Sequence, residues 1–209
     1  MSVKTITETT LNRFYNICEI PHGSGNEKEI GLWLQKWANE HGFACSTDEV
    51  GNVIINVPGK GNLSSKPYVV LQGHMDMVCV KDADSEHDFS KDSIKTYIEN
   101  GWMRAKGTTL GADNGIAIAI AMAIAENDQI QHPPLELLFT VDEERGLTGA
   151  NHLKPNTLKG KILLNLDSEE EGEFTIGCAG GRDSHIELDL ETVKLNCKKQ
   201  IVIRISGLY

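Results

Sequence analysis

Histidine and acidic side chains follow several apolar runs of the chain, at points where β-strands are expected to end. They occur in the clusters His74-Met75-Asp76, Gly111–Gly115, Asp142-Glu143-Glu144 and Asn165-Leu166-Asp167. Because the carboxyl ends of parallel strands meet at one edge of a sheet, these carboxylates and the imidazole would converge there. Converging carboxylates repel one another unless a positive charge lies among them. A metal centre explains the pattern, and a His/Asp/Glu set without cysteine suits Zn²⁺, Mn²⁺ or Co²⁺.

Each cluster also has an ordinary structural explanation when it is taken alone. His74 and Asp76 project to the same side of an extended backbone, as a surface pair would, although apolar residues flank them on both sides. Asp113 lies in a glycine-bracketed loop before a helix, where a carboxylate often serves as an N-cap. Glu143 and Glu144 could belong to a solvated turn. The repeated position after an apolar strand is what favours one common site.

The residue types suggest a division of roles within such a site. Asp76 could steady the neighbouring imidazole through its second ring nitrogen while that imidazole binds metal. Asp113 could bridge two ions with its two oxygens. Of Glu143 and Glu144, one could bind metal while the other takes a proton from the attacking water, as a metal-dependent hydrolase requires. Asp167 ends an apolar strand and is well placed to be a ligand.

Alternating helices and strands are expected to position these residues. Ser24 and Glu27 match a capping box at the start of a helix that ends at Gly42, and Trp33 and Trp37 lie on its core face. Further helices are expected over residues 7–18 and 116–126, strands over 52–57, 68–72, 135–141 and 161–166, and a hairpin over 94–105. This order predicts an α/β fold with a mostly parallel sheet sandwiched by helices, and a site beyond the carboxyl ends of the strands.

Composition excludes several classes of protein. The formal net charge of −10 argues against nucleic acid or anionic lipid as a partner. The cysteines are odd in number, widely spaced and without a CxxC pair, so no disulfide framework is expected. The first residues lack the apolar segment of a signal peptide, and the longest apolar stretch, residues 116–125, is too short to span a bilayer. We therefore expect a cytoplasmic protein that does not enter a membrane.

The character of the sequence changes after Asp167. Residues 174–181 suggest a short strand and a flexible glycine turn. Residues 186–190 and 200–206 then alternate apolar and polar positions, as two strands of a different sheet would. A chain of 209 residues can hold one generous domain and the start of another, which is the organisation we expect.

The motifs together resemble those of the cytosolic aminoacyl-histidine dipeptidases, which are carnosinase-like enzymes of a superfamily of two-metal peptidases and aminoacylases. The resemblance covers residues 5–209, and its most specific stretches are HMDMVCVKD (74–82), GTTLGADNGIAIA (107–119), FTVDEERGLTGA (139–150) and LLNLDSEEEGEFTIGCAGG (163–181). It implies a zinc-peptidase-like catalytic domain over residues 1–183 and the first strands of an α+β lid domain over 184–209. The implied reaction is hydrolysis of the peptide bond of Xaa-His dipeptides such as β-alanyl-histidine.

The resemblance also implies a role for each site residue. His74 and Asp167 would bind one divalent ion, Glu144 would bind the other, and Asp113 would bridge them. Zn²⁺ is the expected metal at both positions, with Co²⁺ and Mn²⁺ as alternatives. Glu143 would act as general base and acid, Asp76 would orient His74, and a cis peptide bond would follow Asp113.

Members of this family are much longer than this chain. They continue through a lid domain, which is expected to form a homodimer interface, and then return to complete the catalytic domain with a last histidine ligand. No histidine of this chain matches that position, so Asp113 and Glu144 alone would hold the second ion. We therefore expect the 209-residue chain by itself to be weakly active or inactive. A sister tripeptidase or N-acyl amino acid hydrolase and a catalytically inactive metal-binding fragment are the alternatives.

Overall fold

The computed structural model describes residues 3–168 and 172–177 together with residues 187 and 201. The chain divides into two units, residues 1–171 and residues 172–209. The predicted domain boundary at 183/184 and nearly all of the strands predicted over 186–190 and 200–206 lie outside the described residues. The fold described below is therefore that of the first unit.

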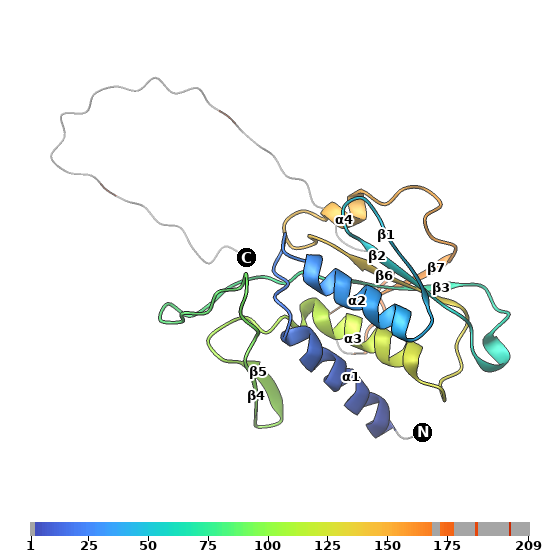
Figure 1. Ribbon diagram of the computed structural model, residues 1–209, viewed down its shortest axis with the longest axis horizontal. Helices are drawn as coiled ribbons and strands as arrows, with labels where there is room; N and C mark the ends of the chain where they lie inside the picture. Colours follow the sequence, from blue (N-terminus) through green and yellow to red (C-terminus); the bar gives the residue numbers. More distant parts are fainter. Residues whose placement is uncertain (1–2, 169–171, 178–186, 188–200, 202–209) are drawn as a thin grey trace. The chain divides into compact units, whose positions relative to one another are not determined.

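A mixed five-stranded sheet with the order β1-β2-β6-β3-β7 forms the centre of this unit (Figure 1). Its strands are β1 (Ala44–Thr47), β2 (Val53–Val57), β3 (Val69–His74), β6 (Leu135–Thr140) and β7 (Ile162–Asn165). β3 pairs in parallel with β6 and β7, whereas β2 pairs antiparallel with β1 and β6. Every strand except β2 thus runs in one direction, which confirms the mostly parallel sheet. β1 was not predicted, because its four residues show no clear alternation of apolar and polar side chains. The strand is also largely exposed.

The predicted hairpin is present as a separate two-stranded sheet. It consists of β4 (Thr96–Glu99) and β5 (Trp102–Ala105), which pair antiparallel. Asn100 and Gly101 join the strands with φ angles of 53° and 82°. Two left-handed residues in succession are typical of the type I′ turn that suits the twist of a two-residue hairpin.

Helices α1 (Val3–Cys18), α2 (Lys28–Glu40) and α3 (Ala112–Glu126) lie together on one side of the sheet (Figure 1). α3 is apolar on nearly all sides and mostly buried, because it packs against both the sheet and α1. Trp37 is buried as predicted, and Trp33 packs against the same core. Within the part of the chain that the structure describes, no helix has the length and apolar character needed to cross a membrane.

A carboxylate at the end of α3 joins the three helices. Glu126 accepts hydrogen bonds from Arg13 Nε and from Trp37 Nε1, each at 3.1 Å. His41, which follows α2, places its Nε2 3.4 Å from the same carboxylate. Because these contacts come from α1, from α2 and from the residue after α2, Glu126 ties the end of α3 to both other helices.

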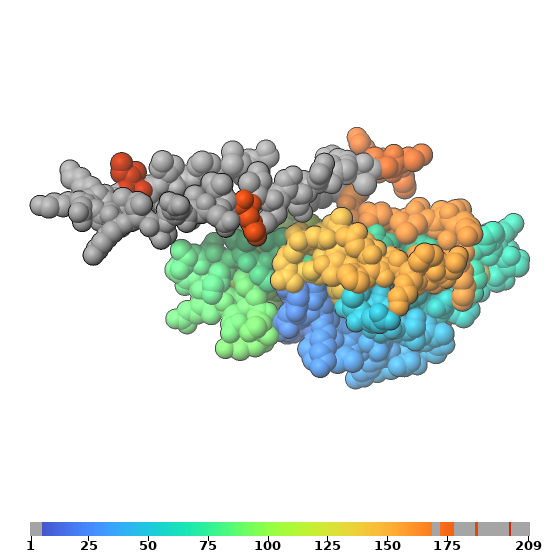
Figure 2. Space-filling view, turned by 90° about the horizontal axis from the view of Figure 1, so that it is seen from above, coloured from blue at the N-terminus to red at the C-terminus, as the bar shows by residue number. Residues whose placement is uncertain are grey.

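The other face of the sheet is covered by the segment that contains the short helix α4 (Thr148–Asn151). In Figure 2 this yellow to orange segment lies on the side opposite the blue helices. Leu153 and Leu158 from this segment pack against a small buried cluster of Ile54, Val70 and Leu138. The edge strand β7 stays open: Ile162, Leu163 and Leu164 are 57%, 50% and 43% exposed. A short 3₁₀ turn, η1 (Gly61–Leu63), lies in the connection between β2 and β3.

The predicted capping box at Ser24 and Glu27 is wrong. α2 begins at Lys28, and no side chain caps its first turn. The Ser24 hydroxyl instead donates to Asp76 Oδ2 at 2.7 Å. Glu27 Oε1 accepts the backbone N–H of Asp142 at 3.0 Å. Partners in distant loops thus replace the local partners that the Ser-x-x-Glu spacing suggests.

Asn52 ties β2 to the end of β6, and its removal should destabilise the fold. Its fully buried side chain accepts a hydrogen bond from Val141 N at 3.0 Å and donates to Gly149 O at 2.9 Å. Asn52→Ala should lower the free energy of unfolding by about 2–4 kcal/mol, because each buried polar group left without a partner costs roughly 1–3 kcal/mol. Urea unfolding followed by circular dichroism measures this, with the exposed Asn62→Ala as the control. Equal stability of the two variants would contradict the assignment.

Candidate metal centre

Side chains from the carboxyl ends of three strands and from the start of α3 meet at one edge of the sheet. His74, which is 1% exposed, places its Nε2 3.0 Å from Asp113 Oδ1 and 3.6 Å from Asp167 Oδ1. Glu143 Oε2 lies 4.0 Å from the same nitrogen. Ligand atoms of His74, Asp113 and Glu144 lie within 4.8 Å of one another, as do those of His74, Glu143 and Asp167. The structure therefore brings together the residues that the sequence predicts as ligands and base.

Strand register explains this convergence. In the parallel ladders, His74 of β3 is level with Thr140 of β6, and Gln72 is level with Asn165 of β7. The loops that follow β6 and β7 therefore leave the sheet at the height of His74. Gly73 adds a close approach on the helix side, since a Cβ there would lie 3.1 Å from Ala117 Cβ. This closeness lets the start of α3 reach the same edge.

Asp76 orients the His74 ring through its main chain as well as its side chain. His74 Nδ1–H donates to the backbone oxygen of Asp76 at 2.8 Å, and Asp76 Oδ1 lies 3.4 Å from the same nitrogen. A hydrogen-bonded Nδ1 leaves Nε2 to face the carboxylates, which is the usual orientation of a metal-binding histidine.

The electrostatics of the cluster favour a cation at His74. Burial by itself would lower the pKa of His74, but the carboxylates of Asp167 and Asp76 outweigh it and raise that pKa to about 11. For Glu143 and Glu144, burial raises the pKa of the carboxyl group, and neighbouring carboxylates raise it further. The charge of His74 lowers it, but by less than the other effects raise it. A site that holds a proton on imidazole so firmly has more negative charge than its own groups neutralise. Imidazole and carboxylate ligands with such an excess fit divalent ions such as Zn²⁺.

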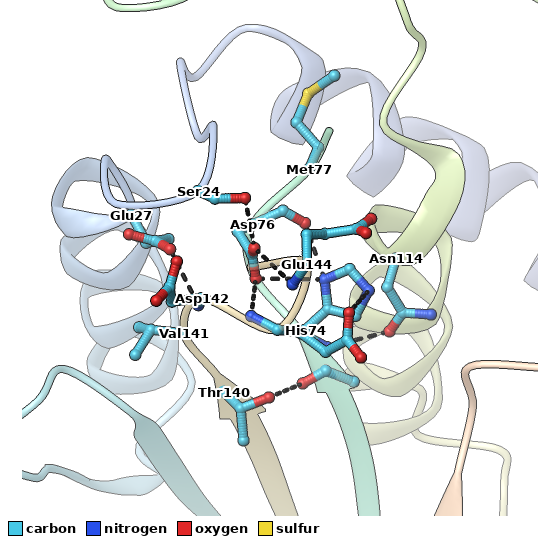
Figure 3. Close-up of polar contacts among 12 residues, drawn as sticks. Ser24, Glu27, His74, Asp76, Met77, Asn114, Thr140, Val141, Asp142 and Glu144 are labelled. Atoms are coloured by element: carbon cyan, nitrogen blue, oxygen red, sulfur yellow. Dashed lines mark hydrogen bonds and ion pairs between the residues drawn. The ribbon is translucent and has the colours of Figure 1, made fainter. Parts of the chain in front are cut away.

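The Asp76 carboxylate also holds the loop that follows β6 (Figure 3). Its Oδ1 accepts the backbone N–H of Glu143 at 2.9 Å, and its Oδ2 accepts that of Glu144 at 3.3 Å. Burial would raise the pKa of Asp76, but hydrogen bonds from His74, Glu143, Ser24 and Glu144 hold it below its ordinary range. Asp76 is therefore a charged acceptor that orients the histidine and both glutamates together.

Asn114 contributes to the same arrangement and was not predicted from the sequence. Its side chain is buried; Oδ1 accepts the His74 N–H at 3.1 Å, while Nδ2 donates to Asp167 Oδ1 at 2.9 Å and to Leu166 O at 3.2 Å. The peptide bond between Asp113 and Asn114 is cis, as the resemblance implies. The sequence does show a side-chain amide directly after Asp113, in the glycine-bracketed loop, and this could have indicated that Asn114 belongs to the site. Asn114 joins β3, α3 and the end of β7 at the site.

A hollow of about 260 Å³ opens beside the cluster on the α4 side of the sheet. Glu143 and Asp167 contribute its carboxylates, and Gln72, Thr140 and Asn165 contribute further polar groups. The other lining side chains are aliphatic: Leu138, Val141, Leu147, Ala150, Leu153 and Leu163. A small molecule that enters this space would therefore meet the two carboxylates next to His74.

The fold and the cluster define a metallopeptidase-like α/β domain. Residues 70–193 match the sequence profile of Peptidase family M20/M25/M40, and the chain belongs to that family. Over 182 residues it is 48% identical to the cytosol non-specific dipeptidase of Escherichia coli (strain K12), an alignment that covers 86% of this chain and 38% of that protein.

Two solved structures share this architecture over most of the chain. The aminoacylhistidine dipeptidase from Vibrio alginolyticus superposes with a TM-score of 0.77 and 48% identity, over 78% of this chain and 34% of that one. The aminopeptidase PepT from Bacillus cereus superposes with a TM-score of 0.65 and 25% identity, over 78% of this chain and 44% of that one. The chain thus spans less than half the length of these relatives.

Loss of the Asn114 side chain should weaken metal binding while the fold is kept. Asn114→Ala should reduce the affinity for Zn²⁺ by roughly 10–100-fold, the usual effect of removing a group that orients ligands. Competition with a chromophoric chelator on the intact protein measures the affinity, and circular dichroism verifies the fold. Asn62→Ala, which removes an exposed amide, should bind as the unchanged protein does. Wild-type affinity in Asn114→Ala would show that the ligands hold their positions without it.

Proposed function

We propose that the protein containing this chain is a two-metal dipeptidase that hydrolyses the peptide bond of Xaa-His dipeptides such as β-alanyl-histidine. The observation that carries the proposal is the convergence of His74, Asp113, Glu144 and Asp167, with Glu143 beside them. Membership of a peptidase family supports hydrolysis of a peptide bond. Similarity to a non-specific dipeptidase and to an aminoacylhistidine dipeptidase supports dipeptides as the substrate class.

We assign His74 and Asp167 to one ion and Glu144 to the other, with Asp113 between them. The two carboxylates closest to His74 Nε2 are those of Asp113 and Asp167, which supports a shared ion for these three residues. Glu144 groups with His74 and Asp113, so Asp113 lies near both the imidazole and Glu144, which supports a bridging role for Asp113. Zn²⁺ is the proposed metal, with Co²⁺ and Mn²⁺ as alternatives that the same ligand types accept.

Divalent ions in these positions would supply Lewis acidity to the substrate carbonyl and to the attacking water. Glu143 is the proposed general base: it takes a proton from that water and returns it to the leaving amine. Its side chain is 30% exposed and is not tightly paired with His74, so it can reach a substrate. Its raised pKa, caused first by burial, brings the carboxyl closer to the range in which it both accepts and donates a proton. Asp76 fixes the backbone from which Glu143 projects.

A wider range of dipeptides is the second candidate, and the name of the Escherichia coli relative favours it. That name also describes a cytosolic protein, which supports the proposed cytoplasmic location.

A homodimer formed through a lid domain is proposed for the full-length protein. Light scattering after size-exclusion chromatography measures its oligomeric state. A monomer at working concentrations would overturn this last proposal.

A substrate panel tests the proposed activity. The full-length protein loaded with Zn²⁺ should hydrolyse β-alanyl-histidine and other Xaa-His dipeptides faster than tripeptides or N-acyl amino acids. A strong chelator should abolish the activity, and added Zn²⁺ should restore it. The 209-residue chain alone should hydrolyse the dipeptides negligibly, since its described ligands leave Asp113 and Glu144 to hold the second ion. Preference for tripeptides or acylated amino acids would identify a sister hydrolase, and no hydrolysis with both ions bound would identify a metal-binding module.

Two substitutions should separate the base from the ligands. Glu143→Gln should keep both ions and lower kcat by about 10²–10⁴-fold, the usual contribution of a positioned acid–base group. Asp113→Ala should instead remove both ions, because a bridging carboxylate serves each of them. Metal analysis and steady-state kinetics on the full-length protein distinguish the two outcomes, with the exposed Glu86→Gln as the control. Near-normal turnover in Glu143→Gln would remove it from the role of base.

A further inference from the structure

The loop that carries Glu143 and Glu144 is anchored by its own backbone amides. The N–H of Asp142 donates to Glu27 Oε1 at 3.0 Å, and the next two N–H groups along the chain donate to Asp76. With the amides directed at Glu27 and Asp76, the side chains of Glu143 and Glu144 are left to face His74 and its carboxylates.

Asp142 has an uncommon backbone conformation. Its φ angle is 53°, in the left-handed region that residues other than glycine enter at a cost. The Asp142 side chain accepts hydrogen bonds from Thr148 Oγ1 at 2.5 Å and from Arg145 Nε at 2.6 Å. The backbone N–H of Asp142 reaches outside this turn to Glu27, a residue 115 positions earlier in the sequence.

Glu27 belongs to a group of three carboxylates, with Asp76 and Asp142, whose oxygens lie within 4.8 Å of one another. Protein donors already satisfy this group. Glu27 Oε1 accepts the N–H of Gly25 at 2.9 Å in addition to that of Asp142. The Ser24 hydroxyl donates to Asp76. The N–H and O–H groups that donate to these carboxylates compensate their negative charge. The carboxylates therefore act as acceptors that hold the loop before α2 and the loop after β6 together.

We propose that Glu27 is a positioning residue, which sets the place of Glu143 by holding the backbone of Asp142. The inference rests on the proposed function, since it assigns Glu27 to the same reaction. Glu27 lies just before α2 and is 8% exposed. Its side chain accepts hydrogen bonds from Gly25 and Asp142 rather than from a predicted metal ligand, so its effect passes through the hydrogen bond to Asp142. A carboxylate on a packed helix start is a firmer anchor than a group in the loop itself.

The position of Glu27 requires a hydrogen-bond acceptor rather than a negative charge. The Glu27 side chain accepts the backbone N–H groups of Gly25 and Asp142 on a single oxygen, Oε1. The amide oxygen of glutamine can accept the same two hydrogen bonds at the same reach. Glu27→Gln should therefore retain the function, whereas Glu27→Ala removes the acceptor. Glu29, exposed on the first turn of the same helix, offers the matched control.

Kinetics on the full-length, Zn²⁺-loaded protein with β-alanyl-histidine test the inference. Glu27→Ala should lower kcat by about 10–100-fold, because misplacing a catalytic group costs a rate of this order. Its KM and its metal content should stay at the wild-type values. Glu27→Gln and Glu29→Ala should keep kcat within about threefold, since neither removes the acceptor. Unchanged kcat in Glu27→Ala, equal damage in Glu27→Gln, or loss of metal in Glu27→Ala would each overturn the proposal.

Hydrogen exchange provides a readout that does not depend on the substrate. In Glu27→Ala, the amide of Asp142 should exchange roughly 10–100-fold faster, as expected when a hydrogen bond to a charged group is lost. Glu29→Ala should exchange at the wild-type rate, and Glu27→Gln, which keeps a neutral acceptor, should stay much closer to that rate than Glu27→Ala does. If the wild-type protein hydrolyses no dipeptide, the proposed function fails, while this measurement still decides whether Glu27 anchors the loop. Wild-type exchange at Asp142 in Glu27→Ala would refute the anchoring.

Discussion

The site depends on the hydrogen bonds that the buried carboxylate of Asp76 accepts. This carboxylate lies 3.4 Å from the His74 ring and accepts hydrogen bonds from the backbone of Glu143, the backbone of Glu144 and the Ser24 hydroxyl. These contacts join the end of β3, the loop after β6 and the segment before α2. A charged acceptor is suited to this task, because hydrogen bonds to an ionised group are stronger than those between neutral groups. Removing it would free the backbone of Glu143 and that of Glu144 at the same time.

Acidic groups gather at this edge in two layers that are stabilised differently. The inner layer, which includes Glu27 and Asp76, is satisfied by backbone amides and hydroxyls. The outer layer faces His74 and includes Asp113 and Asp167, whose charge is left for an external cation to compensate. The inner layer gives the outer one a fixed geometry. Pre-set geometry of this kind lets ligands meet an ion without first reorganising.

The sequence predicts the outer layer well and the inner layer poorly. His74, Glu143 and Asp167 were predicted because each follows an apolar strand, and strand register brings the ends of these strands to one level. Asp113 was predicted from its glycine-bracketed loop before a helix. Local spacing carried that information. The partners of the inner layer are remote in the sequence: Ser24 meets Asp76 across 52 positions, and Glu27 meets Asp142 across 115. The Ser-x-x-Glu pattern suggested a helix cap, because a local partner is the only one that spacing reveals.

The same remoteness applies to the principal sheet. β6, residues 135–140, lies between β2, residues 53–57, and β3, residues 69–74, so β2 and β3 never pair with each other. While the chain is being synthesised, neither strand can pair with β6 until it is made, roughly sixty residues after the end of β3. At about 5–20 residues per second this is a delay of several seconds. During that interval, among the strands of the principal sheet, the β1–β2 ribbon can close from local contacts. Apolar edges that stay unpaired during synthesis are the segments that chaperones shield, so β2 and β3 define where this nascent chain is most exposed.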